Sequence, residues 1–382
     1  MIAPGMGTDG EHPVTNRMSR REALGRVATG LGLASVLKSE TGFVSAAQRP
    51  ADPAASRRTT AQTVMGPIET SKLGFTLSHE HIAASSAGIW QAWPELLGGR
   101  AKFITSAVEQ LKRAKDEGVS SIIDCTTIDL GRDIRLMEEI SRKSGMQVIA
   151  STGHWNDPSN TMRARTAEEL ADFFVREIRV GIEGTDIKAG IIKVANGGMI
   201  DAFGEKVLRA AARASKATGL PITTHSPGAQ RVGEKQAVIF EEEGLTPSKV
   251  CIGHTDNSPA DYQAGLVRRG YYVGMDQLPR GGPAPPGTPL QAPGALTWDQ
   301  RYAQIKALVD AGFANRLMLG NDHSLGMTLQ TTASDPLRIA QNPDGMLFVV
   351  RKAIPALKKI GVSEQAIRVM TVDVPKRFFE SS

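Results

Sequence analysis

The chain has 382 residues, of which 41% are hydrophobic and 22% are charged, and its formal net charge is +5. These values are ordinary for a globular protein and provide enough apolar residues for a large core. The basic residues are scattered rather than gathered in a stripe with aromatic residues, which argues against a nucleic-acid-binding protein. Beyond the N-terminal segment, no apolar run is long enough to span a bilayer.

The N-terminal segment is predicted to be an export signal. The arginine pair Arg20 and Arg21 precedes a short stretch of small apolar residues, and "FVSAAQRP" then offers a cleavage position near Ala46 or Ala47. This order is typical of a twin-arginine signal, and the alternative is a tail without a targeting role. We therefore predict a signal and tail at 1–47, a linker at 48–63, a single folded domain at 64–382, and a periplasmic or secreted protein.

Eight short apolar runs alternate with amphipathic segments through the rest of the chain. The runs are 74–81, 119–127, 146–155, 188–195, 220–226, 249–256, 270–277 and 316–322, and the amphipathic segments include 104–117, 167–182, 203–218 and 298–311. Strands that alternate with helices in this way form a parallel sheet, and eight of them match a closed (β/α)₈ TIM barrel. An open doubly wound sheet is the alternative, but no glycine-rich phosphate-binding motif follows the first run.

Two further features of the chain carry local predictions. Cys125 and Cys251 lie inside apolar runs, which favours two buried free cysteines over a disulfide. The segment 279–298 is rich in proline and glycine, which predicts a long loop.

Side chains that can bind a metal lie at or near the ends of these runs. They are His79, His81, His154, Lys193, His225, His254 and Asp322. In a (β/α)₈ barrel the C-terminal ends of all strands converge on one mouth, so these side chains are expected to lie together. His79 and His81 share one face of their strand while Glu80 is turned away, which suits two ligands of one ion. The pattern predicts a metal site, with buried structural histidines as the alternative.

Lys193 is the unusual member of this set because it lies among Ile191, Ile192 and Val194. An ammonium group beside metal cations in a dry cavity is costly, so a lysine with a lowered pKa or a distant ion pair is one interpretation. A carbamate formed with CO₂ is the other. For a site with two divalent ions and a bridging hydroxide, the carbamate leaves a net charge of about +1, whereas an ammonium leaves about +3.

The motifs "HEH", "GIIKVA", "TTH", "CIGH" and "ND", in this order, resemble those of the bacterial phosphotriesterases of the amidohydrolase superfamily, also called organophosphate hydrolases or aryldialkylphosphatases. The resemblance extends from about residue 66 to residue 367 and implies a (β/α)₈ barrel that forms homodimers. It also implies that His79, His81 and Asp322 bind one ion, that His225 and His254 bind a second, and that a carbamylated Lys193 and a hydroxide bridge them. Zn²⁺ is the expected metal, and Co²⁺ or Mn²⁺ could substitute.

The activity implied by the resemblance is the hydrolysis of organophosphate triesters, which are small-molecule esters. In this mechanism the hydroxide attacks phosphorus and Asp322 accepts the proton. The chain departs from the family pattern where Asn156 replaces an aromatic residue beside Trp155, and where Gln277 and Asn257 occupy positions of a proton relay. The predicted pocket residues are Trp155, Asn156, Leu130, Gln277, Met327 and Gln330. Because this pocket is less aromatic, a lactonase or arylesterase is the nearest alternative, followed by a non-catalytic metal-binding barrel.

Overall fold

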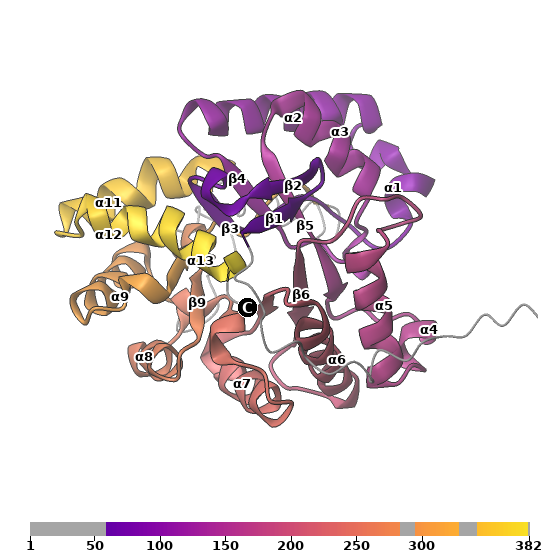
Figure 1. The fold of residues 1–382 in the computed structure, drawn as a ribbon. Helices are drawn as coiled ribbons and strands as arrows, with labels where there is room; N and C mark the ends of the chain where they lie inside the picture. The colour runs from indigo at the N-terminus through magenta and orange to yellow at the C-terminus, as the bar shows by residue number, and fades with distance from the viewer. Residues whose placement is uncertain (1–58, 283–294, 328–341, 381–382) are drawn as a thin grey trace, which may run out of the picture. The chain divides into compact units, whose positions relative to one another are not determined.

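A sheet of parallel strands forms the centre of the computed structural model, which describes residues 59–282, 295–327 and 342–380 (Figure 1). The strands are β3 (Thr76–Ala84), β4 (Ser121–Asp124), β5 (Gln147–His154), β6 (Ile191–Ala195), β7 (Ile222–His225), β8 (Val250–Ile252), β9 (Tyr272–Met275), β10 (Leu317–Leu319) and β11 (His323–Met327). Each of the eight predicted runs overlaps one strand from β3 to β10, so their number and order are confirmed.

The strands follow one another in the order β10-β9-β8-β7-β6-β5-β4-β3-β11, and the neighbouring strands are parallel. β11 follows β10 after a short turn and pairs with β3. The Ser78 hydroxyl donates to the Leu319 carbonyl over 3.0 Å, and the Asp322 amide donates to the His79 carbonyl over 2.9 Å. These bonds join the β10 end of the sheet to β3. The predicted (β/α)₈ barrel is therefore confirmed, with its eighth strand divided between β10 and β11.

Helices follow the strands and surround the sheet (Figure 1). The long ones are α2 (Arg100–Asp116), α3 (Ile134–Ser144), α5 (Ala167–Arg179), α6 (Ala202–Thr218), α7 (Val232–Glu242), α8 (Ala260–Arg268) and α9 (Trp298–Asp310). The short ones are α1 (Ile89–Ala92), α4 (Asn160–Arg163), α11 (Ile354–Lys359), α12 (Glu364–Arg368) and α13 (Val374–Glu380). The four predicted amphipathic segments correspond to α2, α5, α6 and α9, and their apolar faces pack on the sheet because apolar burial is favourable.

Local sequence signals fix where two of these helices begin. Thr166 and Glu169 form a reciprocal capping box at the start of α5, and Thr297 and Gln300 form another at the start of α9. Each box satisfies backbone N–H groups that have no partner inside the helix. The loop predicted at 279–298 begins with a 3₁₀ turn, η9 (Leu278–Gly281), and its residues 283–294 lie outside the described residues.

A small hairpin precedes the barrel and corrects one predicted boundary. β1 (Thr60–Thr63) pairs antiparallel with β2 (Gly66–Glu69), and the Val64 amide donates to the Val148 carbonyl of β5 over 2.9 Å. Residues 60–63 were predicted to be the end of a linker, but they form a strand that packs on the barrel. Hydrogen bonding across a turn, rather than hydrophobic periodicity, orders this short polar segment.

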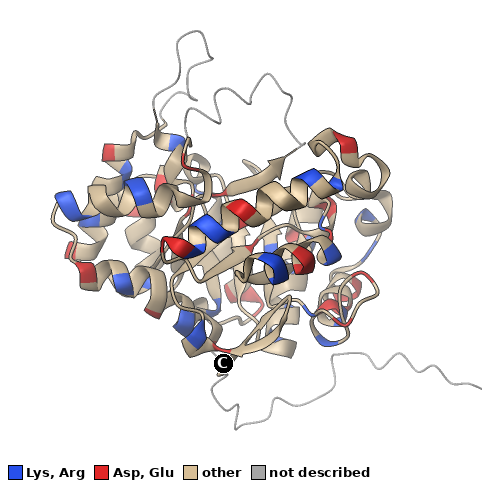
Figure 2. Cartoon of the chain, turned by 90° about the horizontal axis from the view of Figure 1, so that it is seen from above, with Lys and Arg blue, Asp and Glu red and all other residues tan. Residues whose placement is uncertain are grey.

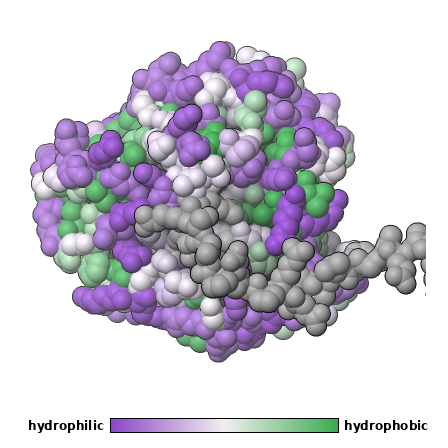
Figure 3. Space-filling view, viewed as in Figure 1, coloured by the Kyte–Doolittle hydropathy of each residue, from purple (hydrophilic) through white to green (hydrophobic). Residues whose placement is uncertain are grey.

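The barrel interior has an apolar part that contains both cysteines. Cys125 and Cys251 are buried and free, packed with Ile123, Ile149 and Ile191, which confirms that prediction. On the outside, Lys and Arg residues are interspersed with Asp and Glu residues along the outer helices (Figure 2). Hydrophilic residues cover most of the face shown in Figure 3, with apolar residues in separate groups. Within the described residues, no helix is both long and apolar enough to cross a membrane.

Candidate metal centre

Six side chains that the sequence marks as candidate ligands come from five different places in the barrel. His79 and His81 lie on β3, Lys193 on β6 and His225 on β7, while His254 and Asp322 follow β8 and β10. His79, His81, Lys193 and His254 are buried, and His225 and Asp322 are partly buried. The structure brings all six together at the C-terminal ends of the strands, where parallel barrels carry their active sites.

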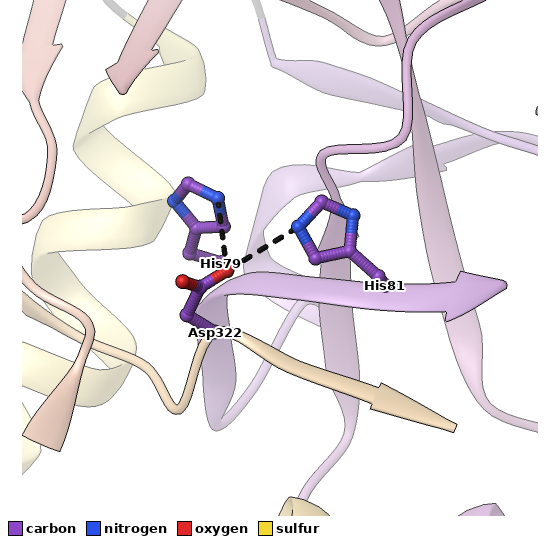
Figure 4. Close-up of side chains that lie close together, drawn as sticks. All are labelled: His79, His81 and Asp322. Atoms are coloured by element: carbon purple, nitrogen blue, oxygen red, sulfur yellow. Dashed lines mark ion pairs between the residues drawn. The ribbon is translucent and has the colours of Figure 1, made fainter. Parts of the chain in front are cut away.

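One part of this centre consists of His79, His81 and Asp322 (Figure 4). Oδ1 of Asp322 lies 3.7 Å from Nε2 of His79 and 3.3 Å from Nε2 of His81. Two imidazole nitrogens and one carboxylate oxygen that face one point in this way form a suitable set of ligands for a divalent ion.

The other part of the centre adjoins the first through His79. Nζ of Lys193 lies 3.0 Å from Nε2 of His79, and the rings of His79 and His254 have centroids 4.6 Å apart. Nε2 of His254 lies 2.8 Å from Nδ1 of His225. The expected ligands of the second ion, His225 and His254, are thus in direct contact with each other.

Asp276, at the end of β9, is a site residue that the sequence analysis missed. Its Oδ1 lies 2.9 Å from Nδ1 of His254 and also accepts the His254 amide over 2.7 Å, while its Oδ2 lies 3.2 Å from Nδ1 of His79. A carboxylate only accepts, so both imidazoles donate from Nδ1 and direct the Nε2 lone pair toward the centre. The available signal was its position near the end of the seventh apolar run, the same kind of position that the candidate histidines occupy. One possible ligand atom from each of His79, His254 and Asp276 lies within 4.8 Å of the others, so these three residues could also hold a metal ion.

The electrostatic environment favours the protonation states that metal ligands need. Burial, followed by the nearby charge of Lys193, lowers the pKa of His79 to about 3. Burial of the His225 ring, together with His254, lowers its pKa well below the usual value. For Asp322, burial opposes ionisation, but Arg280 and His254 outweigh it and hold the pKa well below its ordinary range. Neutral imidazoles and an ionised carboxylate are the forms that bind a cation.

Two of the candidate ligands have an uncommon backbone conformation. His254 has a φ of +59° and Asp322 has a φ of +50°, and neither is a glycine. Left-handed backbone at such residues costs on the order of 1–3 kcal/mol and persists where the surrounding structure fixes it, often at functional sites. The backbone at these two residues is therefore less stable than a relaxed turn, and the strained conformation directs their side chains into the centre.

Lys193 lies in the barrel interior with 1% of its surface exposed. Among the described residues, no carboxylate lies within ion-pair distance of its Nζ, which contacts His79 instead. The backbone of β5 approaches it closely, since a Cβ added at Gly153 would lie 1.9 Å from the Lys193 carbonyl oxygen. The direct ion pair that would explain a buried ammonium is therefore not present in the described part of the chain.

The predicted pocket residues differ in their burial and in their contact with this centre. The Trp155 ring lies edge-on to His225 with centroids 6.0 Å apart, and the neighbouring Asn156 is exposed. Leu130 is buried in the 3₁₀ turn η5 (Ile128–Leu130), and Met327 is partly buried at the end of β11. Gln330 lies outside the described residues. Two members of this group therefore contact candidate ligands: Trp155 lies against His225, and Gln277 bonds to Asp322.

His154, the remaining histidine at a strand end, is not part of the centre. Its Nδ1 lies 3.2 Å from Oδ2 of Asp129, and its ring packs edge-on against Phe203. Asp129 also accepts the amides of Trp155 and Asp157, over 2.9 Å and 3.1 Å. Asp129 therefore fixes the loop that carries Trp155. His154 contacts Asp129 and so helps to hold this loop rather than binding an ion.

The two positions expected to carry a proton relay have a different arrangement. Gln277 donates to Oδ2 of Asp322 over 2.8 Å, and Arg280 donates to the same oxygen over 2.5 Å. Asn257 instead accepts from Arg301 over 3.1 Å, and Arg301 also donates to the Gln277 carbonyl over 3.2 Å. An amide side chain has no titrating group near neutrality, so Gln277 orients Asp322 without relaying its proton. Arg280 was not predicted because it lies in the segment expected to be a loop.

The chain matches known proteins along almost all of its described length. A sequence profile of the phosphotriesterase family matches residues 59–379. Aryldialkylphosphatase of Saccharolobus solfataricus is 34% identical over 316 residues, which cover 82% of this chain and 96% of that protein. The phosphotriesterase homology protein of Mycobacterium tuberculosis is 33% identical over 332 residues, covering 83% and 97%. N-acetyltaurine hydrolase of Xenopus tropicalis is 24% identical over 356 residues, also covering 83% and 97%.

The family profile and the barrel with its convergent histidines agree. The profile covers the strands that carry every candidate ligand, from His79 on β3 to Asp322 after β10. The resemblance noted in the sequence is thereby confirmed, and the chain belongs to the phosphotriesterase family.

Proposed function

We propose that this family hydrolase acts on organophosphate triesters with a centre of two divalent ions. Membership of the phosphotriesterase family implies a binuclear divalent metal centre. The observation that carries the proposal is the convergence of four imidazoles, one carboxylate and one lysine at the barrel mouth. These residues suit the group, since the set combines nitrogen and oxygen donors and Asp276 directs two of the imidazoles.

In this proposal His79, His81 and Asp322 bind one ion, and His225 and His254 bind the other. Lys193, as a carbamate, would supply an anionic oxygen ligand to this centre in place of a buried ammonium. Zn²⁺ is the proposed metal because neutral imidazole and carboxylate are common zinc ligands, with Co²⁺ or Mn²⁺ as substitutes. Bound ions of this kind polarise the P=O or C=O bond and lower the pKa of a water molecule toward neutrality.

The residues of the chain then orient the substrate and handle the proton. Asp322 has one oxygen toward His79 and His81 and the other toward Gln277, so it is placed to accept the proton that the attacking water loses. A phenolate leaving group departs without a general acid because it is a stable anion. Trp155 offers an aromatic edge on which such a leaving group can pack.

A substrate panel with metal-replete protein tests this proposal. The panel contains a diethyl para-nitrophenyl phosphate triester, an acyl-homoserine lactone and an aryl acetate, and the measured quantity is kcat/KM for each. We expect the triester to be hydrolysed and the activity to be lost in His254→Ala, which removes a proposed ligand. Triester hydrolysis at the background rate, in protein that holds two ions, would reject the proposal.

A lactonase or arylesterase that uses the same ions is the second candidate. The observation in its favour is the polar rim, where Asn156 is exposed and Gln277 and Arg280 contact Asp322. Such a rim suits a carbonyl ester better than a bulky aromatic triester. Rapid lactone opening with negligible triester turnover in the same panel would favour it. Two bound ions with no hydrolysis of any ester would instead favour a non-catalytic metal-binding barrel.

We further propose that the protein is exported through the N-terminal twin-arginine segment and forms a homodimer. Substitution of both Arg20 and Arg21 by Lys is expected to keep the protein in the cytoplasm, as measured by cell fractionation. Sedimentation of the mature protein is expected to give twice the mass of one chain, and a mass equal to one chain would refute the dimer.

A further inference from the structure

Glu80, the residue between the two histidines of "HEH", is completely buried and points away from the metal centre. Its Oε1 accepts two hydrogen bonds from Asn321, from the backbone amide over 2.7 Å and from Nδ2 over 2.8 Å. Its Oε2 accepts the amide of His323 over 3.1 Å. The side chain of Glu80 thus binds both residues that flank Asp322 in the turn after β10.

The amide of Asp322 itself also bonds to β3, by donating to the carbonyl of His79 over 2.9 Å. Three successive amides, those of Asn321, Asp322 and His323, are therefore bound to β3, two of them by the Glu80 carboxyl group. This matters because Asp322 has a positive φ, which a non-glycine residue keeps only under restraint.

Asn321 extends this restraint to the other side of the turn. Its Oδ1 accepts the amide of Val349 over 3.0 Å, and its Nδ2 donates to the carbonyl of Met346 over 3.1 Å. The turn is consequently held between β3 and the segment that follows β11. Filling this buried space does not require a glutamate. An apolar residue at position 80 would also fill it, but it would form no hydrogen bonds to the turn.

We propose that Glu80 is a positioning residue that holds Asp322 in place as a ligand of the ion shared with His79 and His81. The inference rests on the proposed function only in assuming that Asp322 binds an ion, and it concerns metal affinity rather than substrate. Glu80 acts through the backbone of the turn, and loss of its hydrogen bonds weakens the ion site that contains Asp322. The site of His225 and His254 is affected less, because Asp276 rather than Glu80 orients His254.

The test compares Zn²⁺ binding by the full-length wild-type protein and Glu80→Gln, measured by equilibrium dialysis against buffered Zn²⁺ and elemental analysis. The glutamine has nearly the same shape, but one carboxyl oxygen is replaced by an NH₂ group. This NH₂ group cannot accept a hydrogen bond from the N–H group of the turn that it faces. We expect the affinity for one of two ions to fall about 10- to 100-fold while the other ion is retained. Glu80→Asp, which keeps the carboxyl group but shortens its reach, is expected to lose the same ion.

Glu177→Gln is the matched control, because Glu177 is a buried carboxylate that accepts from Arg132 and Thr152 away from the centre. It is expected to lower the Tm and to keep both ions at wild-type affinity. If Glu80→Gln does not fold, Asn321→Ser tests the same contacts from the other side and is expected to lose the same ion. Wild-type affinity for both ions in a folded Glu80→Gln or Asn321→Ser would overturn the inference, as would an equal loss of metal in Glu177→Gln. Two ions in the wild type without ester hydrolysis would reject the proposed function but leave this inference intact.

Discussion

The candidate metal centre and the polar residues at its rim, such as Asn156 and Arg280, are built in different ways. In the centre, His79, His254 and Asp322 each contact a second polar group that fixes their orientation. At the rim, Asn156 and Arg280 are exposed, and Arg280 is held by one ion pair. A substitution at the rim therefore disturbs few contacts, whereas one in the centre disturbs several.

This difference explains why membership of a family identifies the chemistry better than the substrate. The relatives carry names as different as aryldialkylphosphatase and N-acetyltaurine hydrolase, and both match more than four-fifths of the chain. A buried centre that is fixed from several sides permits little variation, while an exposed rim can change its side chains at low cost in stability.

Removal of the ions should have the largest effect if the centre is built around them. Chelation is expected to abolish hydrolysis and to lower the Tm by several degrees, since a ligand at about 100 times its Kd stabilises the folded state by about 2.7 kcal/mol. Scanning fluorimetry with and without chelator, followed by addition of Zn²⁺, measures both the loss and the recovery. If the Tm is unchanged in protein that elemental analysis shows to be metal-free, the ions do not stabilise the centre and the prediction is wrong.

Asp276→Asn should have the next largest effect, because Asp276 orients one imidazole from each proposed ion site. We expect the affinity for both ions to fall about 10- to 100-fold, with activity falling in parallel. Competition with a coloured chelator measures the affinity. Asp256→Asn is the control, since it breaks the buried pair with Arg301 and should reduce stability while both ions stay bound. Equal metal loss in the two variants would show that Asp276 has no special role.

Trp155→Ala tests the rim and should leave the metal content unchanged. Its expected effect is a decrease of about tenfold in kcat/KM for aryl esters, because the leaving group loses an aromatic contact, and a smaller decrease for aliphatic lactones. Trp93→Ala removes a tryptophan that is 56% exposed and should behave as wild type. If Trp155→Ala loses metal, the Trp155 side chain contributes to metal binding and not only to contact with the leaving group.

Arg280→Met should have the smallest effect of the four. The Arg280 side chain is 50% exposed, and ion pairs of this kind contribute about 0–1 kcal/mol, so we expect kcat/KM to fall less than about fivefold. Gln277 still donates to Asp322 in this variant, which limits the loss. Kinetics at low and high salt provide the measurement, and the salt dependence should be weaker than in the wild type. A decrease of more than about fiftyfold would show that Arg280 belongs to the centre.

The sequence alone determined the barrel and the ligand candidates. Short apolar runs that end in polar residues identify strands whose C-terminal ends meet, because parallel strands in a closed barrel all point the same way. The spacing of His79 and His81 placed both on one face, and their contact with Asp322 agrees with that reasoning. Hydrophobic periodicity did not reveal the strand Thr60–Thr63, since hydrogen bonding to a partner strand orders it.

The tertiary structure alone decided which residues support the ligands. Asp276 lies 197 positions from His79 along the chain, and Glu80 lies 241 positions from Asn321, so no local pattern connects either pair. These hydrogen-bonded pairs form only when the barrel closes, because closure brings the ends of the first, seventh and eighth strands together. Side-chain types and alternation along a strand are properties of the sequence, whereas the hydrogen bonds that fix a buried charge depend on the complete fold.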